Sequence, residues 1–187
     1  MGRWEPGARG RLLRAALELY ADPGFEQTTV ADIAARAGVT ERTFFRHFAD
    51  KREVLFDGSA DFQARVLEAI AAAPQTDSAL DAAARGMEAA AELLQGRSGP
   101  EFPRRRASVI TANPSLMERE LLKLATVTAA SSRALQDRGA SALEAGIAAE
   151  AAMAAFRLGF ERWVGAEGDR DLPELVTEGI AAFRALA

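Results

Sequence analysis

Apolar residues recur every three or four positions along most of the chain, which is the spacing of a helix with one buried face. The first such run extends from Arg9 to Tyr20 and is followed by Pro23 and Gly24, which end helices. No segment of the sequence shows the strict alternation of apolar and polar residues that marks a strand. The pattern therefore predicts an all-α protein.

Two more short helices are predicted after the first. Thr29 and Asp32 have the spacing of a helix N-terminus, and the short apolar run that follows them ends at Gly38. The next helix is predicted to begin at Thr40. These signals place three short helices within the first fifty or so residues.

A longer fourth helix is predicted from Asp50, which has capping-box spacing with Glu53, to the residue before Pro74. Beyond Pro74 the composition shifts to alanine-rich helices. Their starts are marked by proline or by capping residues, at Asp77 or Ser78, Pro103, Pro114, Ser141 with Glu144, and Asp171 with Glu174. About nine helices are expected in all.

Composition limits the class of function. The chain of 187 residues has 49% hydrophobic and 27% charged residues, no cysteine and one histidine. We therefore expect a soluble, cytoplasmic globular protein without disulfides, cofactors or a metal site. No apolar run approaches the ~18 residues that a membrane span needs, so no association with a membrane is expected.

The net charge of −4 argues at first against nucleic acid as a partner. The charge is unevenly distributed, because residues 1–56 carry nine basic and eight acidic side chains whereas the remainder is acidic. The N-terminal segment has a net charge of 9 − 8 = +1, so the asymmetry is weak.

The segment Gly38–Phe48, GVTERTFFRHF, combines ring surface with hydrogen-bond donors. On a helical wheel stepped by about 100° per residue, Phe44, Phe45 and Phe48 share one side. The other side is a polar arc of Arg42, Thr43, Arg46 and His47, which are side chains that contact phosphates and base edges. One side is thus predicted to be core and the other to be a binding surface.

Two short helices joined by a glycine-containing turn, the second with a donor-rich side, are typical of a helix-turn-helix whose second helix reads DNA. Arg42 or Arg46 can form bidentate bonds to guanine, and threonine can bond a base edge or pack its methyl group on thymine. Lys51, at the start of the next predicted helix, is expected to meet a phosphate.

The N-terminal DNA-binding domain of the tetracycline-repressor (TetR) family is similar to the run TTVADIAARAGVTERTFFRHFADKREVLF. This resemblance implies a helix-turn-helix DNA-binding domain over residues 1–50. It also implies a larger helical effector-binding and dimerisation domain over residues 51–187, of which residues 51–73 form a linker helix.

The resemblance further implies a set of DNA contacts. Thr28 or Thr29 is expected to contact phosphate, and Lys51 to neutralise one. The residues expected at base edges are Thr40, Glu41, Arg42 and Thr43, and those expected at the backbone or at thymine methyl groups are Phe45, Arg46 and His47. Phe45 replaces the tyrosine that is more common in the family and lacks its hydroxyl bond to phosphate. Glu41 suits a cytosine amino group or a place beside Arg42.

Plainer interpretations stay open for the same residues. Phe44 and Phe48 are core residues under either interpretation. His47 can be a structural histidine, and Arg42 and Arg46 can belong to an ordinary solvated face.

The last two predicted helices, Ser141–Val164 and Asp171–Leu186, contain small residues that permit close helix approach, namely Ala145, Ala148, Ala149, Ala152 and Gly159. These residues can form an intramolecular core. The family resemblance implies instead a homodimer in which the two helices pair with their copies into a four-helix bundle. A palindromic operator would follow from the two-fold symmetry.

An effector pocket is a further expectation. The residues expected to face the centre of the larger domain are Met87, Phe102, Met117, Leu121, Phe156, Phe160 and Trp163, with Glu88, Arg119 or Arg157 as polar anchors. Methionine and aromatic stripes of this kind also occur as plain core. A pocket with this lining would suit a small apolar effector.

The predicted function is transcription regulation by a dimeric, ligand-responsive repressor, whose effector would move the fourth helix and change the separation of the reading helices. An enzyme is disfavoured because the sequence lacks cysteine, a phosphate-binding loop and a G-x-S-x-G motif. A helical protein–protein interaction module without DNA binding is the alternative. Steep salt dependence of binding would separate DNA binding from that alternative.

Overall fold

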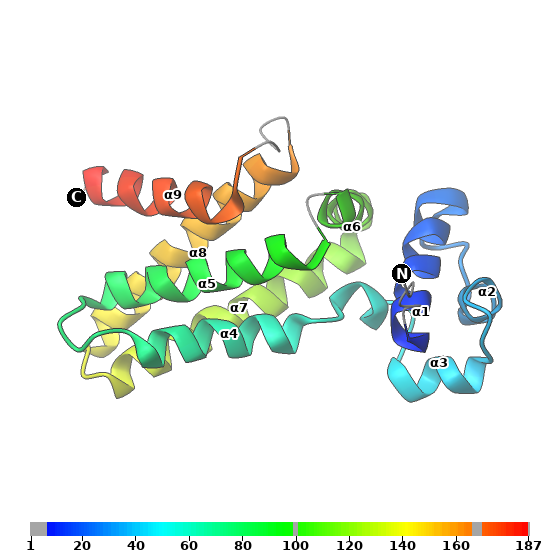
Figure 1. Cartoon of the computed structure of the whole chain (residues 1–187), viewed down its shortest axis with the longest axis horizontal. Coiled ribbons are helices and arrows are strands. Elements are labelled where there is room, and N and C mark those ends of the chain that lie inside the picture. Colours follow the sequence, from blue (N-terminus) through cyan, green and yellow to red (C-terminus); the bar gives the residue numbers. More distant parts are fainter. Residues whose placement is uncertain (1–6, 99–100, 166–169, 187) are drawn as a thin grey trace, which may run out of the picture. The chain divides into compact units, whose positions relative to one another are not determined.

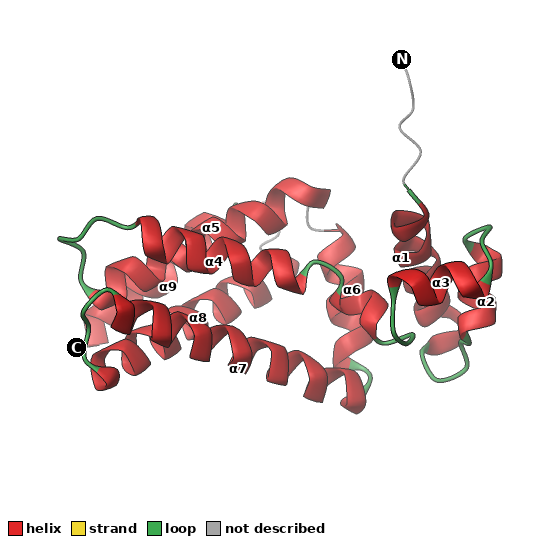
Figure 2. Ribbon diagram, turned by 90° about the horizontal axis from the view of Figure 1, so that it is seen from below, coloured by secondary structure: helices red, strands yellow, loops and turns green. Residues whose placement is uncertain are grey.

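The computed structural model describes residues 7–98, 101–165 and 170–186. Within these residues the regular structure is entirely helical (Figures 1 and 2). The nine α-helices are α1 Ala8–Leu19, α2 Val30–Arg36, α3 Glu41–His47, α4 Ser59–Ala72, α5 Ala79–Ser98, α6 Glu101–Thr111, α7 Pro114–Asp137, α8 Ala142–Val164 and α9 Leu172–Leu186. The predicted all-α fold class is confirmed.

The chain folds as two compact units. The first comprises Met1–Asp57 together with Arg105–Glu120, and the second comprises Gly58–Arg104 together with Leu121–Ala187. The first unit thus includes most of α6 and the start of α7.

The first unit is built on α1, α2 and α3, which pack on one another (Figure 1). Its core consists of fully or almost fully buried side chains from each helix and from the short 3-10 helix Glu53–Phe56, including Leu12, Ile33, Phe44, Val54 and Leu55. The buried side of α1 is therefore the one that packs on α2 and α3.

Arg106 of α6 joins the α6–α7 corner to the rest of the first unit. Its Nε donates to the Leu55 carbonyl at 2.6 Å, and its two terminal nitrogens donate to the Glu120 carboxylate at 3.0 and 2.7 Å. The guanidinium carbons of Arg106 and Arg119 lie 5.3 and 5.8 Å from the centre of the Phe56 ring. We call these five residues the Arg106 cluster.

The fourth helix differs from its prediction. Asp50 caps a turn, since its carboxylate accepts hydrogen bonds from the Arg52 and Glu53 backbone N–H groups, but the chain then forms a 3-10 helix. Gly58 follows with a φ of +87°, in the left-handed region that ends regular helix. The linker helix expected over residues 51–73 is therefore α4, which begins at Ser59.

The second unit contains α4, α5, α8 and α9, which pack on one another (Figure 1). Its core is rich in alanine, and the small residues of α8 are part of it, namely Ala145, Ala148, Ala149, Ala152 and Gly159. These residues are buried within a single chain, so the intramolecular interpretation applies to them. Along the described stretches of the chain, no helix is long and apolar enough to cross a membrane.

Candidate nucleic-acid interface

The turn between α2 and α3 is fixed by local backbone geometry and by one arginine. Gly38 has a φ of +66°, which favours glycine, and the Val39 N–H donates to the Ala34 carbonyl at 2.9 Å. Arg11 of α1 donates from Nε to the Ala37 carbonyl at 3.1 Å. The direction in which α3 leaves the turn is therefore held from α1 as well as from α2.

The start of α3 is capped as the sequence predicts. The Thr40 hydroxyl accepts a hydrogen bond from the Thr43 N–H at 3.2 Å and lies 3.1 Å from the Thr43 hydroxyl. The inner side of the helix is formed by Phe44 and Phe48, whose ring centres are 5.6 Å apart and which are both buried. This pair anchors α3 to the core, whereas Glu41, Arg42 and Arg46 face outward.

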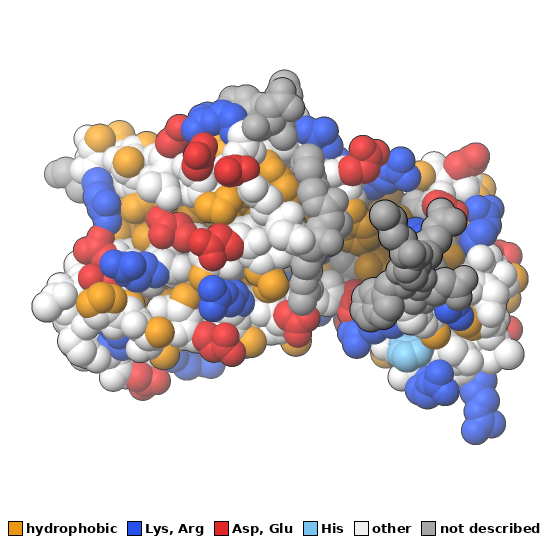
Figure 3. Space-filling view, viewed as in Figure 1, with side chains coloured by type: hydrophobic (Ala, Val, Ile, Leu, Met, Phe, Trp, Pro, Cys, Tyr) orange, Lys and Arg blue, Asp and Glu red, His pale blue; other side chains and the backbone are white. Residues whose placement is uncertain are grey.

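The outer side of α3 is exposed and polar. Glu41, Arg42 and Arg46 are exposed, Thr43 and His47 are half-buried, and the Phe45 ring is 55% exposed rather than part of the core. Among the described residues, neither Arg42 nor Arg46 forms an ion pair. Figure 3 shows basic side chains around the single histidine on the first unit. Both guanidinium groups are thus available to an anionic partner.

The two threonines at the start of α2 differ in their surroundings. Thr28 is buried, and its hydroxyl donates to the Gly24 carbonyl at 2.7 Å. Thr29 is exposed and forms a capping box with Asp32, in which the side chain of each accepts a backbone hydrogen bond from the other. Hydrogen bonds from the Thr29 hydroxyl and N–H lower the pKa of Asp32. Of the two, Thr29 is the one that faces solvent.

The Lys51 side chain is bonded to the loop before α2. Its ammonium donates to the backbone carbonyls of Phe25 and Thr28 at 2.7 and 2.9 Å, and to that of Glu26 at 3.3 Å. The side chain expected to contact a phosphate is therefore hydrogen-bonded within the first unit.

The residues predicted for an effector pocket are distributed over both units. Met87, Phe156 and Trp163 are buried in the core of the second unit, and Phe160 lies between the last two with ring centres 6.1 and 5.9 Å away. The others are less enclosed, since Leu121 is exposed and Phe102 and Met117 are half-buried. Met117 also belongs to the first unit. Of the predicted pocket residues, Met87 and the aromatic series on α8 are brought together in one core.

Two of the three polar anchors predicted for the pocket have partners within the chain, and the third is exposed. Glu88 accepts a hydrogen bond from the Thr177 hydroxyl at 2.9 Å, Arg119 pairs with Glu53, and Arg157 is exposed.

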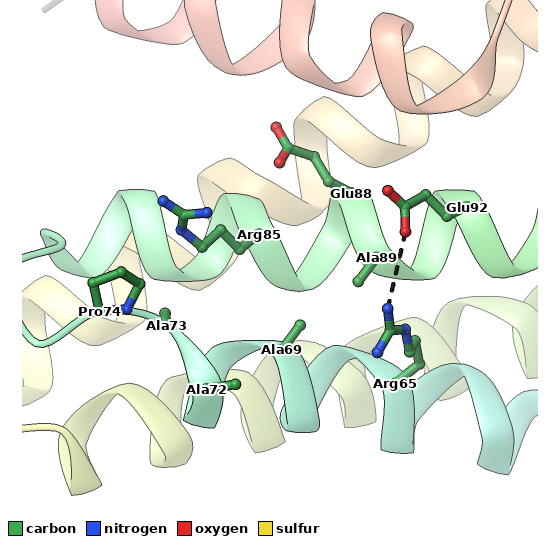
Figure 4. Close-up of a pocket in the computed structure, with 9 residues that line it drawn as sticks. All are labelled: Arg65, Ala69, Ala72, Ala73, Pro74, Arg85, Glu88, Ala89 and Glu92. Atoms are coloured by element: carbon green, nitrogen blue, oxygen red, sulfur yellow. Dashed lines mark ion pairs between the residues drawn. The ribbon is translucent and has the colours of Figure 1, made fainter.

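A shallow surface groove runs between α4 and α5 (Figure 4). Its floor is made of alanine side chains, and an Arg65–Glu92 pair at 3.9 Å closes one side. Glu88 is its one member from the predicted pocket and anchors. The groove therefore gives no support to an effector site among the predicted apolar residues.

The outward side of α8 carries a row of exposed apolar side chains. Leu143, Ile147 and Leu158 are each more than half exposed and lie on one side of the helix. The small residues of α8 face inward, so this row is the apolar surface left for a partner.

Sequence reasoning missed the role of Arg11. Nothing in the sequence distinguishes it from Arg14, which is exposed, because its partner is a backbone carbonyl 26 residues away. The Arg106 cluster was missed for the same reason.

Comparison with known proteins identifies the N-terminal segment. Residues 12–57 match the family model described as bacterial regulatory proteins, tetR family. The HTH-type transcriptional regulator TcmR of Streptomyces glaucescens is 42% identical over 74 residues, which are 40% of this chain and 33% of that protein. The repressor KstR2 of Mycobacterium tuberculosis is 43% identical over 47 residues, or 25% of this chain and 24% of that protein. The matches thus span a third or less of these two relatives.

The fold of the whole chain also has solved counterparts. The TetR-family repressor FadR of Thermus thermophilus, solved with lauroyl-CoA, is 24% identical, with a TM-score of 0.57 over 92% of this chain and 91% of that one. The SmeT–triclosan complex is 20% identical, with a TM-score of 0.64 over 95% of this chain and 91% of that one. Residues 12–57 therefore match the DNA-binding segment of the tetR family, and the chain shares its fold with solved TetR-family proteins.

Proposed function

We propose that the chain is a transcriptional regulator that binds double-stranded DNA through α3. The observation that carries the proposal is the outer side of α3, where Arg42 and Arg46 are exposed without ion-pair partners while Phe44 and Phe48 anchor the helix. A helix presented in this way suits a major groove of about 12 Å. Thr40, Glu41, Arg42 and Thr43 would meet base edges, and Thr29, Phe45, Arg46 and His47 would meet the backbone or thymine methyl groups.

The DNA contacts can be tested with two variants of α3. We expect Arg42→Ala and Thr43→Val to lower the affinity for a selected operator by about 1–3 kcal/mol for the arginine and less for the threonine. Arg133→Ala is the matched control, because Arg133 is exposed on α7 in the second unit. If both variants of α3 bind the operator as tightly as the parent, α3 is not the reading helix.

We infer that the protein acts as a homodimer through α8 and α9. The row formed by Leu143, Ile147 and Leu158 supports this, since exposed apolar rows mark protein interfaces. A two-fold dimer would hold two reading helices about 34 Å apart and require a palindromic operator. Leu158→Glu is expected to give monomers in analytical ultracentrifugation, whereas Arg157→Glu, on a neighbouring face, is expected to stay dimeric. A Leu158→Glu protein that remains a dimer would place the interface elsewhere.

The regulator is proposed to be a repressor released by a small apolar effector held near Phe156, Phe160 and Trp163. FadR was solved with lauroyl-CoA and SmeT with triclosan, so these compounds are the first probes. In a Trp4→Phe background Trp163 is the sole tryptophan of the chain. A compound that releases the operator should then change the emission of Trp163. Release without any such change would place the effector elsewhere.

A further inference from the structure

Lys51 is one of only two lysines among the 23 Lys and Arg residues of the chain. Its ammonium has three N–H donors, and three backbone carbonyls converge on it, those of Phe25, Glu26 and Thr28. The nitrogen also lies 4.4 Å from the centre of the Phe25 ring. All of its hydrogen-bonding capacity is therefore used inside the first unit.

The backbone of Lys51 is held as well. The Tyr20 hydroxyl donates to the Lys51 carbonyl, and the buried Tyr20 ring contacts the Phe25 ring edge to face, with centres 5.1 Å apart. Burial, with a smaller contribution from the Asp50 charge, raises the pKa of Tyr20, so its hydroxyl keeps the proton that it donates. We call Tyr20, Phe25 and Lys51 the Lys51 staple.

The staple fixes the loop that leads into α2. Residues 25–28 contribute all three carbonyls, and the next residue is the N-cap Thr29. The Thr28 hydroxyl closes the same loop onto the Gly24 and Leu19 carbonyls, at 2.7 and 3.1 Å. Any movement of the loop would therefore shift the start of α2 and, through the Gly38 turn, the placement of α3.

A lysine at position 51 suits three converging backbone carbonyls better than it suits a phosphate. An ammonium is a compact charge whose three donors point in different directions, whereas a guanidinium is a planar fork. A phosphate accepts either group, and arginine is favoured where bidentate contact matters. Nearly all basic residues of the chain are arginines. Position 51 is nevertheless a lysine, whose three donors match the three converging carbonyls.

We propose that Lys51 is a positioning residue for operator recognition, which holds α2 and α3 in their reading geometry and makes no phosphate contact itself. This inference rests on the proposed DNA-binding function.

The test measures operator affinity against salt for the parent, Lys51→Met, Lys51→Arg and Arg46→Met. Loss of one phosphate contact lowers the slope of log K against log salt by about 0.9. We expect both Lys51 variants to bind the operator about tenfold more weakly, with an unchanged slope and unchanged affinity for an unrelated duplex. Arg46→Met, as the control, should lose about 0.9 of the slope.

Three results would overturn the inference. A lower slope for Lys51→Met, or full affinity for Lys51→Arg, would make Lys51 a phosphate contact. Unchanged operator affinity of folded Lys51→Met, below its melting temperature, would make the staple merely structural. A parent that binds no duplex would instead overturn the proposed function, before any variant is compared.

A measurement on the unaltered protein covers the case in which the variants do not fold. The ammonium ¹⁵N resonance of Lys51 can be followed by NMR, with Lys123 on α7 as the only other lysine signal. We expect a slowly exchanging Lys51 ammonium whose shift does not change when operator is added. A shift that follows the titration would show a DNA contact and contradict the inference.

Discussion

Arg106→Met is the substitution that tests most directly how the α6–α7 corner is held in the first unit. Methionine keeps the apolar stem of the side chain and removes the guanidinium. The change deletes two hydrogen bonds to Glu120, one to the Leu55 carbonyl and the stacking on Phe56. The side chains of Arg106 and Glu120 are only 19% and 23% exposed, so water replaces these contacts poorly.

The expected cost follows from these contacts. Hydrogen bonds between charged groups are worth about 1.5–3 kcal/mol, and a buried carbonyl left without a donor costs about 1–3 kcal/mol. A cation–π contact adds roughly 0.5–1 kcal/mol. Because the pair is partly exposed, we take the low end of each range and expect a loss of about 3 kcal/mol in the free energy of unfolding.

Urea unfolding followed by circular dichroism measures this loss, with Arg133→Met as the exposed control, expected to change stability by less than about 0.5 kcal/mol. A double-mutant cycle with Glu120→Gln should give a coupling energy of about 1–2 kcal/mol between Arg106 and Glu120. A loss below about 0.5 kcal/mol, or no coupling, would refute the account of this cluster.

Two further predictions concern Gly58, which precedes α4, and the acid stability of the second unit. Gly58→Ala should destabilise by about 1 kcal/mol, because a φ of +87° costs an L-residue about 1–2 kcal/mol and the stiffer unfolded chain offsets part of it. Gly96→Ala, where an added Cβ meets nothing within 4 Å, should instead stabilise by up to about 1 kcal/mol in urea unfolding. Equal effects would contradict the left-handed assignment. Hydrogen bonds from Arg170 and then Arg162 lower the pKa of Glu178 from 4.5 to about 2. Its folded pKa is depressed, so its contribution to stability is full above pH 4.5 and is lost as the pH falls toward 2. An NMR titration of the Glu178 carboxylate checks this, and a midpoint near the ordinary value would show that the two arginines do not hold it.

The features that could be predicted from sequence are those set by neighbours along the chain. Thr29, Thr40 and Ser141 were predicted as helix starts, and each side chain accepts a hydrogen bond from the N–H three residues later. Such a cap depends only on a short segment, so a single sequence contains all the information that it needs. Helical periodicity likewise predicts that Phe44 and Phe48 are buried and that Arg42 and Arg46 are exposed, but it is wrong for Phe45, which is 55% exposed.

Local signals failed where the same residue types serve another geometry. Asp50 and Glu53 have the spacing of an α-helix cap, yet the turn that Asp50 caps continues as a 3-10 helix and ends at Gly58. A capping side chain satisfies the first N–H groups of either kind of helix, so its spacing does not tell them apart. Gly58, whose backbone is in the left-handed region, separates this 3-10 helix from α4.

Contacts between distant segments could not be predicted. The carbonyls around Lys51 come from a loop more than twenty residues earlier, and the Leu55 carbonyl bound by Arg106 is 51 residues away. Backbone carbonyls are present at every position, so nothing in the sequence marks those that a given cation will meet. For that reason the sequence indicates neither the carbonyl partners of Lys51 nor those of Arg106.

The central claim, that α3 reads DNA in a two-fold dimer, is tested most directly by selecting random duplex DNA against the purified protein, with its oligomeric state measured in the same buffer. The account predicts enrichment of a palindrome with half-sites about 10 base pairs apart, centre to centre, or a multiple of that spacing. A folded dimer that enriches no sequence at low salt would contradict it and favour a helical interaction module that does not bind DNA.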